Sequence, residues 1–243
     1  YRLNPTALRR TRETSPSPRD DALRLRLAFR PPYHRAALLG FFGARAMTGI
    51  ETMRPDGMVR TLAVAHRGQT LLGWIAWRFA TRAHEVELAS APSLAPAAGV
   101  LTQRLRHALD LDAEPERIDN ALAAMPLPPR PGLRVPGSFD GFETAVRVVL
   151  GQQVTVQAAR TLTHRLIERF GRPVDTPFAG LTRLFPVAEA IATASADAIG
   201  SLGIVRQRVG ALQALARAVH DGQIELHRAA PLDDTLARLR ELP

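Results

Sequence analysis

A polar pair, Gln152 and Gln153, breaks the pattern of the helix that leads into it. Apolar residues from Phe142 to Val149 repeat at the spacing of one helix face, and the next position of that stripe holds Gln153. Because Gly151 weakens the helix directly before the pair, we predict that the backbone turns there and presents both amides at a helix-to-helix junction. Amides both donate and accept hydrogen bonds, so the pair could recognise a ligand, or it could simply cap and solvate the junction.

Acidic, histidine, serine and cysteine residues give little sign of a catalytic group. Six aspartates stand where helix caps and turns need a short acceptor, and we assign that role to Asp140, Asp175, Asp197, Asp221, Asp233 and Asp234. The seven His are dispersed without a His-x-x-x-His pair, and the absence of Cys excludes thiolate metal sites, disulfides and cysteine nucleophiles. A Ser-His-Asp set stays open, although no serine lies in a nucleophile-elbow context. Among these residue types we single out no catalytic residue, and we predict no cofactor.

Composition and charge narrow the class of protein. The 243 residues are 46% hydrophobic and contain no apolar run long enough to cross a bilayer and no secretory signal, which predicts a cytoplasmic protein of two domains with no membrane partner. The net charge of +9 favours a nucleic-acid partner. Its distribution weakens that argument, because the first thirty residues hold eight Arg against three acids and the rest of the chain is closer to balance.

The first half of the chain predicts an antiparallel sheet with helices on one face. Leu23 to Arg30 alternates apolar and charged residues, as a strand with one buried face does. Strands over 58–66 and 70–78 flank a short turn and form a hairpin, and residues 84–89 form a fourth strand. Residues 34–46 suit a helix.

Helical periodicity replaces the strand signals after residue 89. We predict helices over 94–109 and 115–125, and then a linking segment over 126–136. The five prolines of this segment prevent it from continuing a helix. Further helices follow to the end of the chain. The predicted fold class is α+β, with a tail over 1–20, a sheet domain over 21–110 and an incomplete all-helical domain over 111–243.

Two separated motifs resemble one known family. They are Arg-Pro-Gly-Leu-Arg-x-Pro-Gly at 130–137, followed by Leu-Gly-Gln-Gln-Val-Thr-Val at 150–156, and Leu-Gly-Phe-Phe-Gly-Ala-Arg-Ala at 39–46. Both are similar to the 3-methyladenine DNA glycosylase II family, the AlkA type, within the helix-hairpin-helix glycosylase superfamily. The resemblance runs from about residue 22 to residue 243. It implies base-excision repair, in which an alkylated base is swung out of duplex DNA and its N-glycosidic bond is hydrolysed.

The same resemblance assigns roles to particular residues. Phe41 matches a pocket aromatic whose ring would attract the positive charge of an alkylated purine, and Arg45 lies one helical turn away on the same face. Gln153 matches the side chain that fills the gap left by the flipped base, although the family pattern has Leu there. Gln152 would support the turn. The alternatives are an ordinary core residue for Phe41 and a solvated surface residue for Arg45.

Both ends of the chain suggest a longer protein. The closing residues match the approach to the family's DNA-binding hairpin, where the backbone carbonyls of Arg240 and Leu242 would contribute to an incomplete cation site. The family's essential Asp would follow, so we expect the 243-residue chain to be inactive alone. The first ten residues resemble the end of an AraC-type helix-turn-helix of an Ada-like regulator, which suggests a fusion of regulator and glycosylase.

The sequence therefore predicts a monomer that binds double-stranded DNA carrying alkylated bases and uses no nucleotide cofactor. A non-catalytic DNA-binding module that regulates or senses damage is the alternative, because function lives in the site rather than in the fold.

Overall fold

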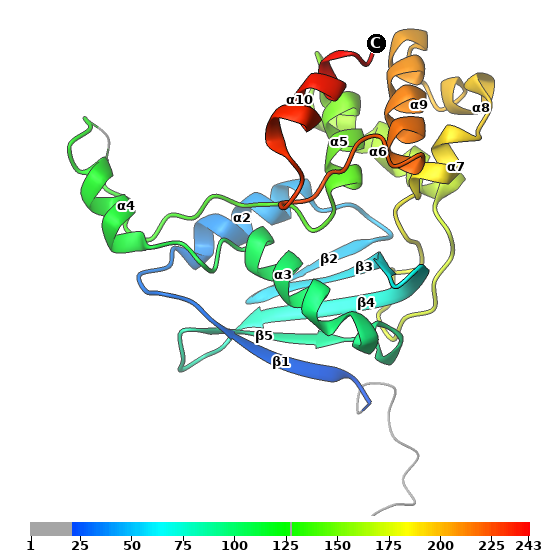
Figure 1. Ribbon diagram of the computed structural model, residues 1–243. Helices are drawn as coiled ribbons and strands as arrows, with labels where there is room; N and C mark the ends of the chain where they lie inside the picture. The colour runs from blue at the N-terminus through cyan, green and yellow to red at the C-terminus, as the bar shows by residue number, and fades with distance from the viewer. Residues whose placement is uncertain (1–20, 127) are drawn as a thin grey trace, which may run out of the picture.

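The computed structural model describes residues 21–126 and 128–243 and contains one five-stranded antiparallel sheet of strand order β1-β5-β4-β3-β2 (Figure 1). The strands are β1 (Leu23–Ala28), β2 (Glu51–Arg54), β3 (Gly57–His66), β4 (Gln69–Phe79) and β5 (Glu85–Ser90). The first helices are α2 (Arg35–Arg45), the 3-10 helix η1 (Pro92–Ala97), α3 (Ala98–Ala108) and α4 (Pro115–Leu122). The later helices are α5 (Gly141–Gly151), α6 (Val156–Phe170), α7 (Ala188–Ala192), α8 (Ala196–Gly200), α9 (Arg206–His220) and α10 (Leu232–Arg240).

The predicted hairpin is present as β3 and β4. Its turn places Arg67 and Gly68 at φ of 49° and 76°, and two successive positive φ values are what a two-residue hairpin turn requires. The short strand β2 was not predicted. It pairs with β3 at the edge of the sheet. Its four residues, Glu-Thr-Met-Arg, have too little β propensity to predict a strand from the sequence.

Helices α2 and α3 lie over the same face of the sheet (Figure 1), as the α+β prediction required. Their buried side chains share one core with the strands, in which Phe42 of α2 and Leu105 of α3 join Trp77 of β4. The helix predicted over 94–109 is in fact two elements. Pro96 lies inside the 3-10 helix η1, and the regular α-helix begins only at Ala98.

The helical part has its own core, built where α5, α6 and α9 meet. Val146, Leu150, Leu166 and Leu212 are fully buried in it. The predicted apolar stripe of α5 was only partly right. Val146 is buried, but the stripe that the helix buries runs Glu143, Val146, Leu150, whereas Phe142 and Val149 are only partly buried.

The Arg-Pro-Gly-Leu-Arg-x-Pro-Gly motif ties the linking segment to the sheet domain. Arg134 is buried and its guanidinium donates to the backbone carbonyls of Pro32 and Asp110, at 3.1 and 3.2 Å. Gly132 has a φ of 72°, and a Cβ there would lie 2.5 Å from the carbonyl carbon of Pro32. This motif therefore has a structural role, since it seats the segment that leads into α5.

No helix in the described ranges is long and apolar enough to cross a membrane. The resemblance of the first ten residues to a helix-turn-helix lies outside the described residues.

Candidate functional site

A cleft of about 610 Å³ separates α2 from the junction of α5 and α6. Phe41 and Arg45 of α2 line one side of it, and Gly151 and Val154 line the other. The structure therefore brings the two separated motifs of the sequence to one cleft. We call the backbone turn over residues 151–154 the corner.

The ring of Phe41 is partly buried and already faces a cation. The guanidinium carbon of Arg45 lies 3.9 Å from the centre of that ring, and Arg45 Nη1 donates to the Phe41 carbonyl at 3.3 Å. Phe42, by contrast, is buried and packs against Trp77 and Phe139, with ring centres 6.2 and 5.6 Å apart. Phe42 and Phe139 also line the cleft but are buried, so Phe42 anchors the helix and Phe41 is the more accessible of the three rings.

Two arginines from the helical part dock the end of α2. Arg147 of α5 donates to the carbonyl of Arg45, and Arg160 of α6 donates to the carbonyl of Ala46 at 3.1 Å. The last carbonyls of a helix have no partner within it and attract cations. These bonds therefore fix the position of Phe41 and Arg45 relative to α5 and α6.

A buried ion cluster lies between the sheet and α5, at what we call the junction between sheet and helices. Arg60 of β3 contacts Glu51 of β2 at 3.1 Å and Glu143 of α5 at 2.5 Å, and all three side chains are at most 5% exposed. Arg147 extends the cluster through a 3.0 Å bond to Glu143. The Arg60 guanidinium also lies 4.7 Å from the ring centre of Phe139. The cluster thus links the sheet to α5 through three nearly buried side chains at the floor of the cleft.

The two carboxylates of this cluster have opposite pKa shifts. Burial raises the pKa of Glu51 above its ordinary value, and the attraction of Arg60 only partly opposes that effect. Burial acts in the same direction on Glu143, but the charges of Arg60 and Arg147 outweigh it and lower the pKa of that carboxyl. Glu143 is therefore the firmly ionised partner of Arg60, and the cluster is suited to joining elements rather than to transferring protons.

The corner ends α5 and starts α6. Gln152 is extended, with φ −64° and ψ 129°, and Gln153 has a φ of 53°, in the left-handed region. That conformation costs a residue with a Cβ about 1–2 kcal/mol. Thr155 then caps α6, because its hydroxyl accepts from the Ala158 amide at 3.2 Å. The predicted turn is therefore present, and it stores backbone strain at the edge of the cleft.

Both glutamine side chains are exposed and stand at the rim rather than among the residues that line the cleft. The carbonyl of Gln152 accepts a 2.5 Å hydrogen bond from Arg208 Nη2 of α9. Sequence reasoning missed Arg208 and the buried cluster. One signal was available, because Glu143 occupies the apolar stripe that α5 buries.

Arg240 and Leu242 lie at the end of α10, where the Leu242 amide donates to the Leu239 carbonyl at 3.4 Å. No residue of α10 is buried. No group of three or more His, Asp or Glu side chains suited to a metal ion occurs within the described part of the chain. The backbone cation site predicted at Arg240 and Leu242 remains a prediction.

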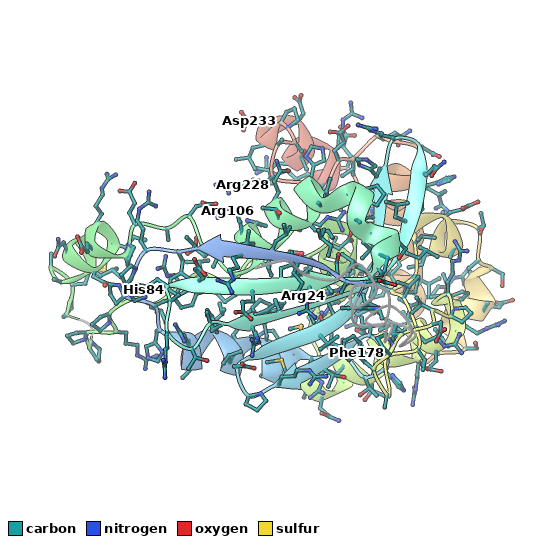
Figure 2. All side chains as sticks on the ribbon, turned by 90° about the horizontal axis from the view of Figure 1, so that it is seen from below. Arg24, His84, Arg106, Phe178, Arg228 and Asp233 are labelled. Carbon is teal, nitrogen blue, oxygen red and sulfur yellow. The ribbon has the colours of Figure 1, made fainter. Side chains whose placement is uncertain are left out.

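A second hollow of about 810 Å³ lies on the sheet face opposite α2 and α3. Figure 2 labels two of the residues that line it, Arg24 of β1 and Phe178 of the segment after α6. None of the residues predicted from the sequence to act in a site lines this hollow.

Two families match the chain in succession. The family described as AlkA N-terminal domain matches residues 24–140, and the family described as HhH-GPD superfamily base excision DNA repair protein matches residues 146–239. The first match contains α2 and the ion-cluster residues of the sheet, and the second contains the corner.

Individual relatives give the same result. The chain is 32% identical over 219 residues to DNA-3-methyladenine glycosylase 2 of Escherichia coli (strain K12), which covers 89% of this chain and 74% of that protein. It is 32% identical over 256 residues to a probable bifunctional transcriptional activator/DNA repair enzyme AlkA of Mycobacterium tuberculosis (strain CDC 1551 / Oshkosh). That alignment covers 98% of this chain and 48% of the relative, so the chain spans about half of its length.

Solved structures share the fold at low identity. A 3-methyladenine DNA-glycosylase from Archaeoglobus fulgidus superposes with a TM-score of 0.57 at 18% identity, over 79% of this chain and 66% of that one. An 8-oxoguanine glycosylase/lyase of Clostridium acetobutylicum, solved with double-stranded DNA, gives 0.52 at 10% identity, over 81% and 74%. At these identities the likeness establishes the fold alone.

Proposed function

The chain belongs to the AlkA-type DNA-3-methyladenine glycosylases of the HhH-GPD base-excision repair superfamily, and from this premise we propose that the protein containing it flips alkylated bases into the cleft between α2 and the corner. The intact protein then hydrolyses the N-glycosidic bond of the flipped base. The observation that carries this proposal is the geometry of the cleft, with an aromatic ring on one wall and a strained backbone turn on the other.

Phe41 is the proposed receptor for the base. An alkylated purine carries a positive charge, and the face of an aromatic ring attracts a desolvated cation by about 2 kcal/mol. Arg45 occupies that attraction in the present structure, at 3.9 Å from the ring centre. The proposal therefore requires the Arg45 guanidinium to move off the ring when the base enters, which its exposed position at the mouth of the cleft permits.

Gln153 is the proposed wedge. Taking a base out of the stack costs a few kcal/mol, and a side chain that fills the gap offsets part of this cost. Gln153 is exposed at the rim, and its side-chain amide can hydrogen-bond the base of the opposite strand that is left unpaired. Gln152 supports the turn through its backbone carbonyl, which is held by Arg208.

Binding to an abasic duplex tests the wedge. In the full-length protein that contains this chain, Gln153→Ala is expected to weaken binding to a duplex with an abasic site by about tenfold, the equivalent of about 1.4 kcal/mol. Gln157→Ala is the matched control, because Gln157 is also exposed but lies in the first turn of α6, outside the corner. Unchanged affinity of the Gln153→Ala protein would remove this residue from the wedge role.

Release of free base tests the reaction. The full-length protein is expected to release 3-methyladenine from methylated duplex DNA, as measured by chromatography of the ethanol-soluble fraction. Tight binding to the same DNA without release would instead support a damage-sensing module.

The M. tuberculosis relative supports a second function for the longer protein. Its alignment covers 98% of this chain, against 89% for the E. coli relative, and its name includes transcriptional activation. We propose that the protein containing this chain is likewise a fusion of regulator and glycosylase. Sequence-specific binding of the full-length protein to an undamaged promoter fragment, in a gel-shift assay with competitor DNA, tests it; binding without sequence preference would count against it.

A further inference from the structure

Gln153 needs support from outside its own turn. Among the described residues, three with a Cβ have a positive φ: Arg67, Asp110 and Gln153. Arg67 lies in a hairpin turn that requires this conformation, and Asp tolerates it better than most residues. Gln153 has neither advantage, so something beyond its local sequence must hold the corner in shape.

The contacts within the corner are weak. The amide of Gln152 donates to the Val149 carbonyl at 3.4 Å, at the long end of the hydrogen-bond range. The Gln152 carbonyl accepts from Arg208 Nη2 at 2.5 Å. The Gln152 carbonyl and the Gln153 amide belong to one planar peptide unit. Holding that oxygen therefore holds the orientation of the peptide plane that precedes Gln153, and this restricts the φ of Gln153.

Arg208 is well placed to hold this oxygen. It lies in the first turn of α9, next to Val209, which is buried with Val146 and Leu150 of α5 in the helical core. Packing of α9 against α5 therefore carries the guanidinium to the end of α5. A guanidinium also keeps its charge at any physiological pH, which strengthens its bond to a carbonyl.

We propose that Arg208 is a positioning residue for base flipping, which acts by holding the Gln152 carbonyl and thereby keeping Gln153 in the conformation that enters the DNA stack. The inference rests on the proposed function, because it gives Gln153 the wedge role. The inference goes beyond the proposed function because it assigns the positioning of Gln153 to a residue of α9.

A double-mutant cycle in the full-length protein tests the proposal. Arg208→Met is expected to weaken binding to an abasic duplex by about tenfold when residue 153 is Gln. In the Gln153→Gly protein the same substitution is expected to change affinity by less than twofold, because Gly adopts positive φ readily and carries no side chain to position. Loss of the same size in both backgrounds would overturn the proposal.

The competing role for Arg208 is a direct contact with a DNA phosphate. Such a contact would reduce the slope of log affinity against log salt by about one, in either background. Arg206→Met is the matched control, since Arg206 is exposed on the same turn of α9 and, among the described residues, no hydrogen bond or ion pair joins its side chain to the corner. A reduced slope for Arg208→Met, with no dependence on residue 153, would assign Arg208 to the phosphate and overturn the positioning role.

Thermal unfolding without DNA separates this inference from the proposed function. If Arg208 holds the corner, the shift in Tm caused by Arg208→Met is smaller in the Gln153→Gly protein than in the parent. Additive shifts overturn the inference whatever the DNA experiments show. If the Tm shifts are not additive but the parent protein fails to bind an abasic duplex, the contact between Arg208 and the Gln152 carbonyl is supported. The proposed function is then overturned, and with it the role of Arg208 in base flipping.

Discussion

The two regions that frame the cleft are held in place in opposite ways. At the junction between sheet and helices, Arg60 bridges Glu51 and Glu143 with side chains at most 5% exposed. At the corner, the guanidinium of one partly buried arginine holds a strained turn through a solvent-exposed bond to one carbonyl. Buried ionic groups tolerate little displacement, because any gap leaves a charge without a partner in a medium of low polarity. An exposed bond can be exchanged for one with water or DNA.

This difference matches what each region must do in the proposed reaction. The junction sets the separation between α2 and α5, which has to be the same before and after the base enters. The corner has to adapt when its side chain enters a DNA stack. Four predictions, in order of expected size, test this contrast.

The largest effect is expected at the junction. Arg60→Met leaves Glu51 and Glu143 buried without their shared cation and should lower the free energy of unfolding by about 3–5 kcal/mol in urea denaturation. The control is Arg78→Met on the neighbouring strand, whose ion pair with Glu87 leaves the Arg78 side chain 58% exposed and should cost less than about 1 kcal/mol. Equal losses for the two variants would show that the buried cluster does not anchor the junction.

The next effect concerns selectivity at the wall opposite the corner. Phe41→Leu keeps an apolar side chain but removes the ring face, so release of a cationic base such as 3-methyladenine should fall by up to about 30-fold, the equivalent of about 2 kcal/mol. Release of a neutral base such as hypoxanthine should fall much less. Phe79→Leu, at a buried ring of β4 that does not line the cleft, should reduce stability without changing that ratio. Equal loss on both bases would mean that the ring does not sense charge.

A smaller effect is expected in the pH dependence of stability. The raised pKa of Glu51 means that this carboxyl binds a proton more readily in the folded protein than in the unfolded chain. The free energy of unfolding should therefore rise as pH falls from above the folded pKa of Glu51 toward its ordinary value of about 4.3. The lowered pKa of Glu143 has the opposite sense, and its contribution is lost as pH falls below that ordinary value.

Measuring the free energy of unfolding of the parent and of Glu51→Gln from pH 8 to pH 4.5 isolates the first contribution, because the other titrating groups are common to both. The parent should gain stability relative to the variant as pH falls. A relative loss over the same range would show that the pKa of Glu51 is lowered.

The smallest effect on stability is expected at the corner. Gln153→Gly relieves a strain of about 1–2 kcal/mol but adds about 0.5–1 kcal/mol of chain entropy to the unfolded state, so the free energy of unfolding should change by less than about 1 kcal/mol in urea denaturation. The same variant should lose affinity for an abasic duplex. A loss of stability approaching that of Arg60→Met would mean that the corner supports the fold as strongly as the junction does.

Much of the architecture was predictable from local patterns. The strand at Leu23–Ala28, the hairpin turn at Arg67 and Gly68 and the end of α5 at Gly151 all follow from alternation, turn residues and helix periodicity. The edge strand β2 was missed, because four residues with ordinary side chains form a strand only when β3 offers them a partner.

The corner and the class of protein could be inferred from short stretches of sequence. Gly151, the polar pair and the Thr155 cap act within a few residues of one another, and the two motifs are read directly from the chain. The contacts that hold these parts in place depend on how the whole chain folds. Arg60 and Glu143 lie 83 residues apart, and Arg208 reaches a carbonyl 56 residues away. Charge attraction and burial act through space between side chains that share no local period, so such partners become visible only when the chain is folded.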